Sequence, residues 1–489
     1  MQRSIGRGFQ QCQTQCCSPT CGGVGRHVTL TSPMPSVTDN ETKRPTASRR
    51  TKIALIVAGV IILLPGLVTA VLYSRHRGAA IAAEKQRASG PPDLRTDDIE
   101  QKLLATGDLN GAAEAYRQLV ASGSQDYRVN DNLGVVYARL GRYDKAIACA
   151  REAVKLAPDS VSPYGNLAID LMARQQPEDA HDTVRRAMSS GMDNLRFHSA
   201  LYALAFLSPA GPDKPAMADQ LQWFARRPKY ESYGLMLASN TEAFGGHVER
   251  ARDLAARAVD TASQGERADL PGAWAESAAL REAAFGDTDD ARKLAQAGLK
   301  LAHAGPEAEA QAALTFALIG DAGRSEALAR DVNKRFPADT QLQSVWLPAV
   351  QAELALLKKN PDKAINDLAP AVALELGEST FGPNPSCLYS TYLRGQAYLA
   401  DEKGTAAATE FQKIIDHDGV VWNCWTGALA HLGLARAYVL QAQEAEGQDV
   451  DEIRLKALMA YKDFLRLWKD ADPAIPVLTQ AKDELANMQ

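Results

Sequence analysis

Residues 132–158 of the chain, NLGVVYARLGRYDKAIACAREAVKLAP, decide its fold. Apolar side chains recur every three or four positions on either side of Gly141, which predicts two short amphipathic helices joined by a tight turn. A hairpin of this size cannot bury its apolar face alone, so it must stack against similar units. The stretch is therefore one member of a helical array.

Small residues repeat along the chain with a constant spacing. Gly107 and Ala112 are followed 34 residues later by Gly141 and Ala146, and Ala180 lies another 34 residues on. This period is typical of the tetratricopeptide repeat, which is a hairpin of two helices. The positions that fit the repeat are Leu133, Gly134, Tyr137, Gly141, Ala146, Ala153, Pro158 and Ala180.

These positions have packing roles rather than chemical ones. We expect Gly134 and Ala146 to lie where the two helices cross, since a larger side chain would force the helices apart. Leu133 and Tyr137 are one helical turn apart and fill the interface between the helices. Pro158 ends the second helix before the next unit begins.

The pattern continues to the C-terminus with looser spacing. Gly395, Tyr398 and Phe411 keep the offsets of the repeat. The last unit pairs residues 432–438 with residues 457–468 across a longer acidic loop. No convincing strand pattern occurs along the chain. We expect an all-α protein, built as a solenoid of about ten helical hairpins of the tetratricopeptide type.

One segment before the repeats has the composition of a transmembrane helix. Residues 53–73, IALIVAGVIILLPGLVTAVLY, carry no charge over 21 positions, which is about the length that a bilayer requires. A cleavable signal peptide is the alternative. Five Lys or Arg residues at 43–52 precede the segment and four at 75–87 follow it. This balance favours a single span with a cytoplasmic N-terminus and an exported C-terminal part.

These features divide the chain into four parts. They are a disordered N-terminal segment at 1–51, a transmembrane helix at 52–74, a linker at 75–97 and the superhelical domain at 98–489. A polar, basic lead-in to the apolar segment begins at Met34, which makes Met34 an alternative start of the chain.

The seven cysteines fall into two sets. The first set crowds the N-terminus at Cys12, Cys16, Cys17 and Cys21. These cysteines meet the paired ligand spacing of a zinc site only loosely, so we predict no metal site. In the second set, Cys387 and Cys424 lie on adjacent helical units, and they are able to form a disulfide if this part is exported.

Charge and motifs argue against several classes of function. A net charge of −5 and a pI near 6.0 argue against nucleic-acid binding, which needs a basic face. The sequence contains no phosphate-binding loop, no HExxH motif and no GxSxG motif. We therefore predict no catalytic residue and no cofactor, and a protein or peptide as the partner.

A stack of hairpins leaves a groove lined by the first helix of each unit, the usual binding face of a solenoid. The polar first-helix residues that we expect in this groove are Asn132, Arg139, Asn166, Asp170 and Arg394. The alternative for each is solvation or capping of local backbone. Trp422 and Trp425 flank Cys424, where either packing between the last two units or a ligand pocket would explain them.

Four C-terminal stretches resemble the tail of bacterial eukaryotic-like serine/threonine protein kinases. They are YLRGQAYLA, EFQKIIDHDGVVWN, GALAHLGLARAY and DFLRLWKDADPAIPVLTQAKDE. The resemblance covers residues 52–489. In that family a cytoplasmic kinase domain precedes one membrane helix and a tetratricopeptide ectodomain. Similar tails also follow winged-helix regulators in some bacteria.

The kinase motifs themselves are absent from this chain, which has no glycine-rich loop, no HRD catalytic loop and no DFG metal site. The resemblance therefore implies the membrane-plus-repeat part alone, in a bacterial inner membrane with the repeats in the periplasm or outside the cell. We expect a membrane-anchored interaction scaffold without catalysis. The alternative is a sensory subunit that signals with a separately encoded kinase.

Overall fold

A computed structural model describes residues 95–301, 305–379, 385–446 and 449–488. The chain divides into two compact units, Met1–Glu84 and Lys85–Gln489, and all described residues belong to the second unit. The apolar segment at 53–73, Met34 and the four N-terminal cysteines lie outside the described residues. None of the helices that the structure describes is both long and apolar enough to span a bilayer.

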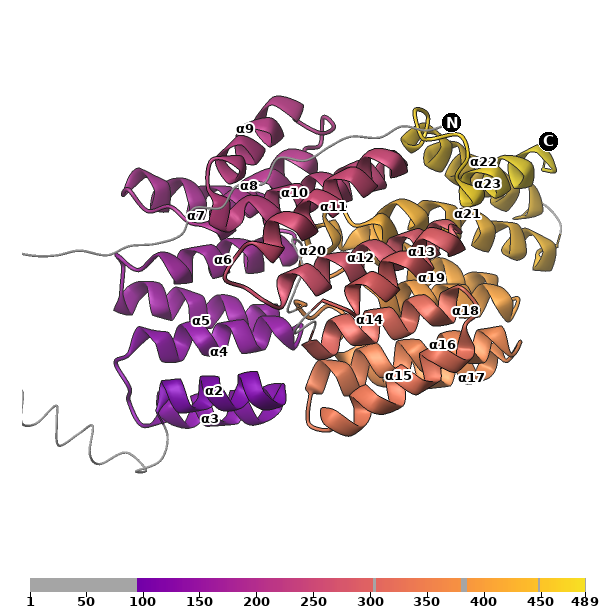
Figure 1. Cartoon of the computed structure of the whole chain (residues 1–489). Coiled ribbons are helices and arrows are strands. Elements are labelled where there is room, and N and C mark those ends of the chain that lie inside the picture. The colour runs from indigo at the N-terminus through magenta and orange to yellow at the C-terminus, as the bar shows by residue number, and fades with distance from the viewer. Residues whose placement is uncertain (1–94, 302–304, 380–384, 447–448, 489) are drawn as a thin grey trace, which may run out of the picture. The chain divides into compact units, whose positions relative to one another are not determined.

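The described residues form ten helical hairpins and no strand (Figure 1). The first five are α2 (Thr96–Thr106) with α3 (Leu109–Ala121), α4 (Tyr127–Arg139) with α5 (Tyr143–Leu156), α6 (Val161–Ala173) with α7 (Pro177–Ser189), α8 (Leu195–Phe206) with α9 (Lys214–Ala225), and α10 (Pro228–Phe244) with α11 (Val248–Ser263). The next five are α12 (Leu270–Phe285) with α13 (Thr288–Gly298), α14 (Gly305–Leu318) with α15 (Ala322–Arg335), α16 (Leu347–Leu357) with α17 (Pro361–Asp367), α18 (Tyr389–Ala400) with α19 (Gly404–Asp416), and α21 (Trp425–Glu444) with α22 (Asp449–Leu467).

Four shorter or single elements complete the domain. They are the π-helix η1 (Leu342–Trp346), the 3-10 helix η2 (Ala369–Ala373), α20 (Asp418–Val421) and the final helix α23 (Pro476–Ala486). The acidic stretch in the last unit is mostly helical rather than a long loop, since α21 runs to Glu444 and α22 begins at Asp449.

Small side chains set the distance between the helices of a hairpin. A Cβ atom added to Gly134 in α4 would lie 3.3 Å from the carbonyl oxygen of Ala146 in α5, so the two helices cross here. A Cβ added to Gly395 would lie only 2.7 Å from the ring of Phe411. Gly141 has a φ of +69° in the turn, a conformation that glycine adopts without strain. The short turn and the close crossing follow directly from these residues.

The other repeat positions lie in the same helical core. Six of the repeat positions are buried apolar side chains, at Leu133, Tyr137, Ala146, Ala153, Ala180 and Phe411. Tyr398 is half-buried on α18, and Pro158 lies two residues after Leu156, the last residue of α5. Neighbouring hairpins pack on one another, as α3 does on α4 and α5 on α6. The hairpin at 132–158 is thus stacked on both sides.

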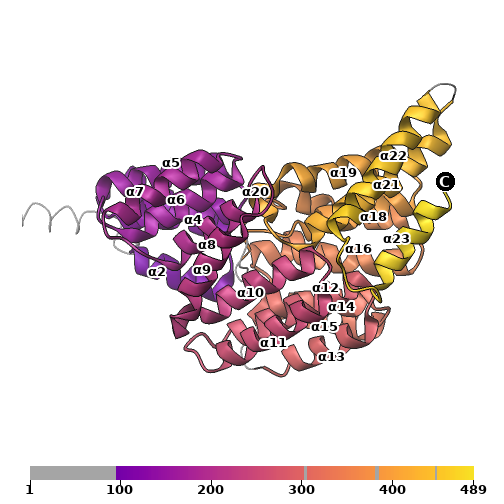
Figure 2. The same cartoon turned by 90° about the horizontal axis from the view of Figure 1, so that it is seen from above.

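The turns of the early hairpins contact segments from the C-terminal half of the domain. The amide of Thr340 donates to the Gly107 carbonyl in the α2–α3 turn at 3.0 Å. The Gln175 side chain in the α6–α7 turn donates to the Asp416 carbonyl at 2.8 Å, where α20 packs against α6 (Figure 2). The Gly246 carbonyl in the α10–α11 turn accepts from the Asp472 amide at 3.1 Å. The domain is therefore closed by contacts between residues that are far apart in sequence.

Candidate functional site

The two predicted groove arginines, Arg139 and Arg394, bond to other residues of the chain. The Arg139 guanidinium donates to the Gln341 side chain at 3.1 Å. The Arg394 guanidinium is 5% exposed and donates to the Glu375 carboxylate at 2.9 Å. Gln341 lies in the connection between α15 and η1, and Glu375 lies in the connection between η2 and α18. Connecting segments of the chain therefore accept hydrogen bonds from both guanidinium groups.

The predicted groove residues on α4 and α6 also lie in contacts between hairpins. The Asn132 side chain donates to the Tyr116 hydroxyl at 3.2 Å, and the Asn166 side chain donates to the Asp131 carboxylate at 2.7 Å. Asp170 is 1% exposed, and burial raises the pKa of its carboxyl well above the ordinary value. Asn132 and Asn166 thus bond to side chains of neighbouring hairpins and do not cap local backbone.

A cleft of about 360 Å³ opens instead on the C-terminal hairpins. It is lined by the first helices of five consecutive hairpins, α12, α14, α16, α18 and α21, together with α23. The lining residues are Leu280, Ala283, Ala284, Phe285, Gly286, Leu314, Leu318, Glu353, Leu356, Tyr389, Tyr392, Leu393, Gln396, Ala400, Trp425, Arg436, Val477 and Gln480. We call this the first-helix cleft. Its volume falls within the range of small-ligand pockets in proteins.

Aromatic rings form one wall of the first-helix cleft. The ring of Trp425 lies 5.6 Å from that of Tyr389 and 5.5 Å from that of Tyr392, centroid to centroid. The Phe285 ring stands edge-on to Trp425 at 6.4 Å. Packing of this kind holds large, flat side chains in place while Tyr389 and Tyr392 stay half-buried. The wall is thus preformed and only partly covered.

Two charged residues line the cleft, and they differ in their partners. Arg436 makes two hydrogen bonds to Glu484 of α23, both 2.9 Å long, and the Tyr461 hydroxyl donates to the same carboxylate at 2.9 Å. Glu353 on α16 has no hydrogen-bond or ion-pair partner among the described residues. Burial raises the pKa of the Glu353 carboxyl to about 7. The cleft therefore carries one uncompensated carboxyl group.

The disulfide between Cys387 and Cys424 lies next to the aromatic wall. Their Cα atoms are 5.6 Å apart, Cys387 precedes Tyr389 by two residues and Cys424 precedes Trp425 directly. The bond therefore ties the start of α18 to the start of α21. The remaining described cysteine, Cys149, is a free thiol whose pKa burial raises to about 11, which makes it a poor nucleophile.

The two tryptophans near Cys424 have separate environments. Trp425 is 4% exposed and packs against Tyr389 and Tyr392 of the preceding hairpin, and it also lines the first-helix cleft. Trp422 is 2% exposed and packs in the apolar cluster of α6 and α8, where its indole nitrogen donates to the Gly419 carbonyl at 2.9 Å. Asn423 between them donates to the Leu237 carbonyl of α10 at 2.8 Å. The two tryptophans therefore belong to different apolar clusters.

Sequence reasoning did not single out Glu353, Tyr389 or Tyr392. A helical signal was nevertheless present, because Tyr389 and Tyr392 are three residues apart and Gln396 follows four residues later. This spacing places all three side chains on one face of a helix. The partner surfaces from five other helices were not visible in the sequence.

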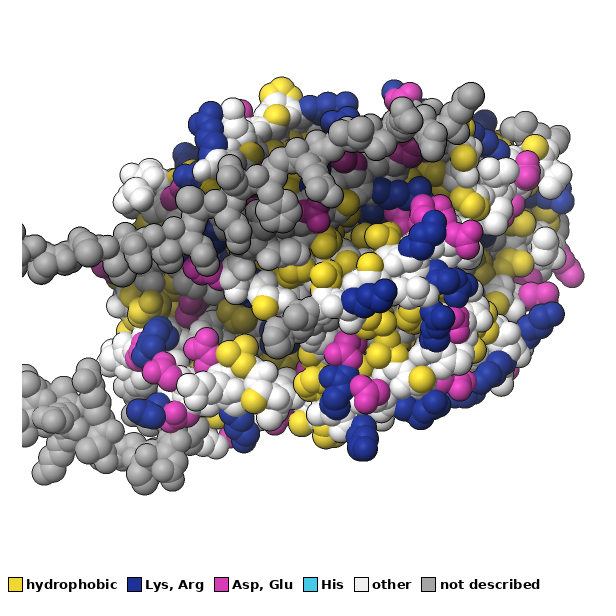
Figure 3. Space-filling model, viewed as in Figure 1, with side chains coloured by type: hydrophobic (Ala, Val, Ile, Leu, Met, Phe, Trp, Pro, Cys, Tyr) yellow, Lys and Arg dark blue, Asp and Glu magenta, His cyan; other side chains and the backbone are white. Residues whose placement is uncertain are grey.

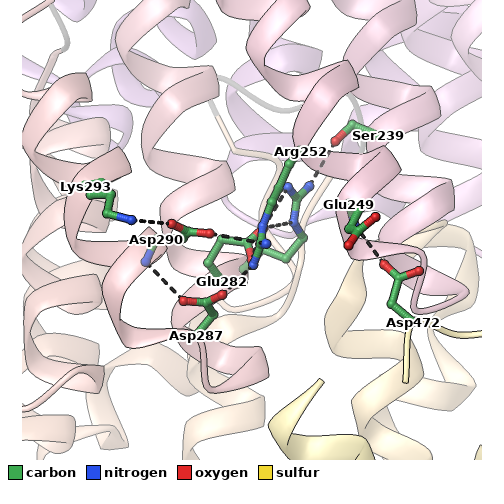
Figure 4. Close-up of polar contacts among 9 residues, drawn as sticks. Ser239, Glu249, Arg252, Glu282, Asp287, Asp290, Lys293 and Asp472 are labelled. Atoms are coloured by element: carbon green, nitrogen blue, oxygen red, sulfur yellow. Dashed lines mark hydrogen bonds and ion pairs between the residues drawn. The ribbon is translucent and has the colours of Figure 1, made fainter. Parts of the chain in front are cut away.

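Elsewhere, charged residues make structural contacts between hairpins. Arg252 of α11 contacts Glu282 at 2.6 Å, Asp287 at 2.7 Å and Asp290 at 3.2 Å (Figure 4). Figure 3 shows basic and acidic side chains interspersed over the face that it views. Within the described residues, no group of three or more His, Cys, Asp or Glu side chains is placed to hold a metal ion.

Comparison with known proteins places a tetratricopeptide repeat in the chain. A family model described as a tetratricopeptide repeat matches residues 101–161, which span α2 to the start of α6. Yeast Tom70 is 14% identical, with a TM-score of 0.33, over 80% of this chain and 94% of its own. A tetratricopeptide repeat protein from Parabacteroides merdae is 14% identical, with a TM-score of 0.28, over 64% of this chain and 99% of its own. No curated protein matches the chain in sequence.

Proposed function

We propose that the chain is a non-catalytic interaction scaffold that binds a protein or peptide segment in the first-helix cleft. The observation that carries this proposal is the wall of half-buried Tyr389 and Tyr392 beside Trp425, on the first helices of the solenoid. Aromatic side chains that are fixed by their neighbours and open to solvent are typical anchors for a partner. The six packed helices around the cleft would bind such a segment with little reorganisation.

Two neighbouring leucines of α16 provide the test. Leu356 lines the cleft, whereas Leu357 is 41% exposed and does not line it. The partners of full-length wild type, Leu356→Arg and Leu357→Arg would be identified by crosslinking and mass spectrometry in intact cells. We expect Leu356→Arg to lose the partner and Leu357→Arg to keep it. Equal partner sets for the two variants would contradict binding in the cleft.

We further propose that residues 53–73 anchor the scaffold in a bacterial inner membrane, with the N-terminus in the cytoplasm and the repeats outside it. The uncharged length of this segment and its basic flanks support this topology. The disulfide between Cys387 and Cys424 supports it too, because such bonds persist in oxidising compartments. Protease added to intact spheroplasts should digest the repeats. Full protection of the repeats would contradict this topology and indicate the opposite one.

A second candidate function is that of a sensory subunit for a separately encoded kinase. The C-terminal sequence stretches that resemble receptor-type serine/threonine kinases, in the same order along the chain, favour this function. In that case the membrane segment would pass a signal from the cleft to a cytoplasmic partner. Purification of the full chain from detergent extracts should then recover a kinase, whereas repeated recovery of envelope proteins alone would oppose it.

A further inference from the structure

We propose that the first-helix cleft selects a ligand segment with a lysine or arginine side chain between apolar residues, and that Glu353 binds the basic group. This inference rests on the proposed function, because it names the chemistry of the ligand in the same cleft. Three independent features of the cleft lead to it, namely its charge, its aromatic wall and its apolar surroundings.

The first feature is the unbalanced charge of the lining. The Arg436 guanidinium is already bonded to Glu484 through both of its facing nitrogen atoms, so the charges of that pair cancel. Glu353 has no such partner within the described residues. A carboxyl group in a largely apolar cleft is costly to ionise unless a cation accompanies it. A basic ligand group supplies that cation, whereas an acidic ligand would meet an uncompensated carboxylate.

The second feature is the aromatic wall. Tyr389, Tyr392 and Trp425 line the same cleft as Glu353. The faces of such rings attract ammonium and guanidinium groups, most strongly where water is excluded. A basic side chain entering the cleft would thus meet a carboxylate and aromatic rings together. Neither feature favours a ligand carboxylate or phosphate.

The third feature is the apolar remainder of the lining. Leu280, Leu318, Leu356 and Val477 contribute from four different helices. They would accommodate the methylene groups of the basic side chain and the apolar residues on either side of it. A fully polar, basic segment would gain less from these surfaces than one with apolar flanks. We therefore expect one basic residue in an apolar context rather than a run of basic residues.

A random library of 12-residue peptides, displayed on phage, would test the inference on the full-length chain. Selection would be run on wild type, Glu353→Gln and Glu100→Gln, and the selected peptides would be re-tested on Leu356→Arg. Glu100→Gln removes one exposed carboxylate far from the cleft lining and serves as the charge control. Thermal melts followed by circular dichroism would show that each variant is folded.

We expect peptides from wild type and Glu100→Gln to be enriched in lysine or arginine between apolar residues. Their affinity should fall roughly tenfold to a hundredfold on Glu353→Gln, the range for loss of one charge-assisted hydrogen bond. Two results would overturn the inference and leave the proposed function unaffected. One is that peptides which need the intact cleft show no enrichment in lysine or arginine, and the other is that the peptides bind Glu353→Gln as tightly as wild type. Peptides that all bind Leu356→Arg as well as wild type would overturn both.

A measurement on wild type alone gives an independent check if Glu353→Gln fails to fold. The affinity for a selected lysine peptide should be higher at pH 8 than at pH 6, because Glu353 loses its proton over this interval. The other titratable groups of the lining are Tyr389, Tyr392 and Arg436, whose pKa values burial or partners raise, so they keep their charge state over this range. A pH-independent affinity would contradict the role of Glu353.

Discussion

The carboxylate of Asp472 accepts a hydrogen bond of 2.9 Å from the backbone amide of Glu249, although 223 residues separate them (Figure 4). Glu249 lies in the first turn of α11, where His247 at the N-cap position gives no capping hydrogen bond of its own. The indole nitrogen of Trp468 donates to the nearby Phe244 carbonyl at 2.9 Å. The loop between α22 and α23 thus caps a helix in the middle of the chain.

Replacement of Asp472 should destabilise the domain through the loss of this cap. We expect Asp472→Ala to lower the free energy of unfolding by about 1 kcal/mol, the usual cost of removing a capping side chain. Asp470→Ala is the matched control, because Asp470 is exposed in the same segment. Urea titration followed by circular dichroism would measure both. Equal, negligible losses for the two variants would show that the cap contributes nothing.

Alanine variants of two turn glycines should distinguish the cost of backbone strain from the cost of disturbing the contact with the C-terminal loop. Gly246 and Gly320 have φ angles of +79° and +81°. A Cβ on Gly246 would lie 2.5 Å from the Ala471 side chain, whereas a Cβ on Gly320 would have no neighbour within 4 Å. Backbone strain should lower the free energy of unfolding of both alanine variants by about 1–2 kcal/mol. Overpacking should lower that of Gly246→Ala by a further ~1–3 kcal/mol. Similar unfolding midpoints for the two would refute the docked turn.

Reduction of the disulfide should loosen the aromatic wall of the cleft. The bond between Cys387 and Cys424 closes a sequence separation of 37 residues, so its loss should cost about 2–4 kcal/mol. Dithiothreitol should lower the melting temperature of wild type and of Cys149→Ser, and leave the Cys387→Ser/Cys424→Ser double variant unchanged. Mass mapping without reductant should find the two peptides joined. Free thiols at both positions would contradict the bond.

The protonation of Glu353 should make stability depend on pH. Burial raises the pKa of its carboxyl from 4.5 to about 7, so between these values the folded chain binds more protons than the unfolded one. The free energy of unfolding therefore falls as pH rises through this window, by at most about 3 kcal/mol. The measured fall should be smaller than this, because water in the open cleft partly solvates the carboxylate. Glu353→Gln should be more stable than wild type at pH 8 and about equal to it at pH 4.

The comparison of the two unfolding curves is the measurement, with Glu100→Gln as the exposed control. A Glu353→Gln variant that gains no stability at alkaline pH would show that the carboxyl ionises without cost. A gain of the same size in Glu100→Gln would assign the effect to net charge rather than to the cleft.

The hairpins were predictable because the signals that build them are local. Gly134, Gly141 and Ala146 specify a crossing and a turn within one unit, and their spacing of 34 residues carries over to the next unit. The polar first-helix residues were less predictable. Their types suggested a groove, but Arg139 bonds to Gln341, which is 202 residues away, and Arg394 bonds to Glu375 in the connection before α18.

By itself, the sequence determined the helical class, the repeat and the small residues that let helices approach. The tertiary structure alone decided which surface stays open. The turns at Gly107, Gln175 and Gly246 are covered by segments far away in the sequence, whereas Glu353 has no hydrogen-bond or ion-pair partner in the described part of the chain. Periodicity reports only which face of a helix is apolar, because contacts between distant residues depend on how the solenoid closes on itself.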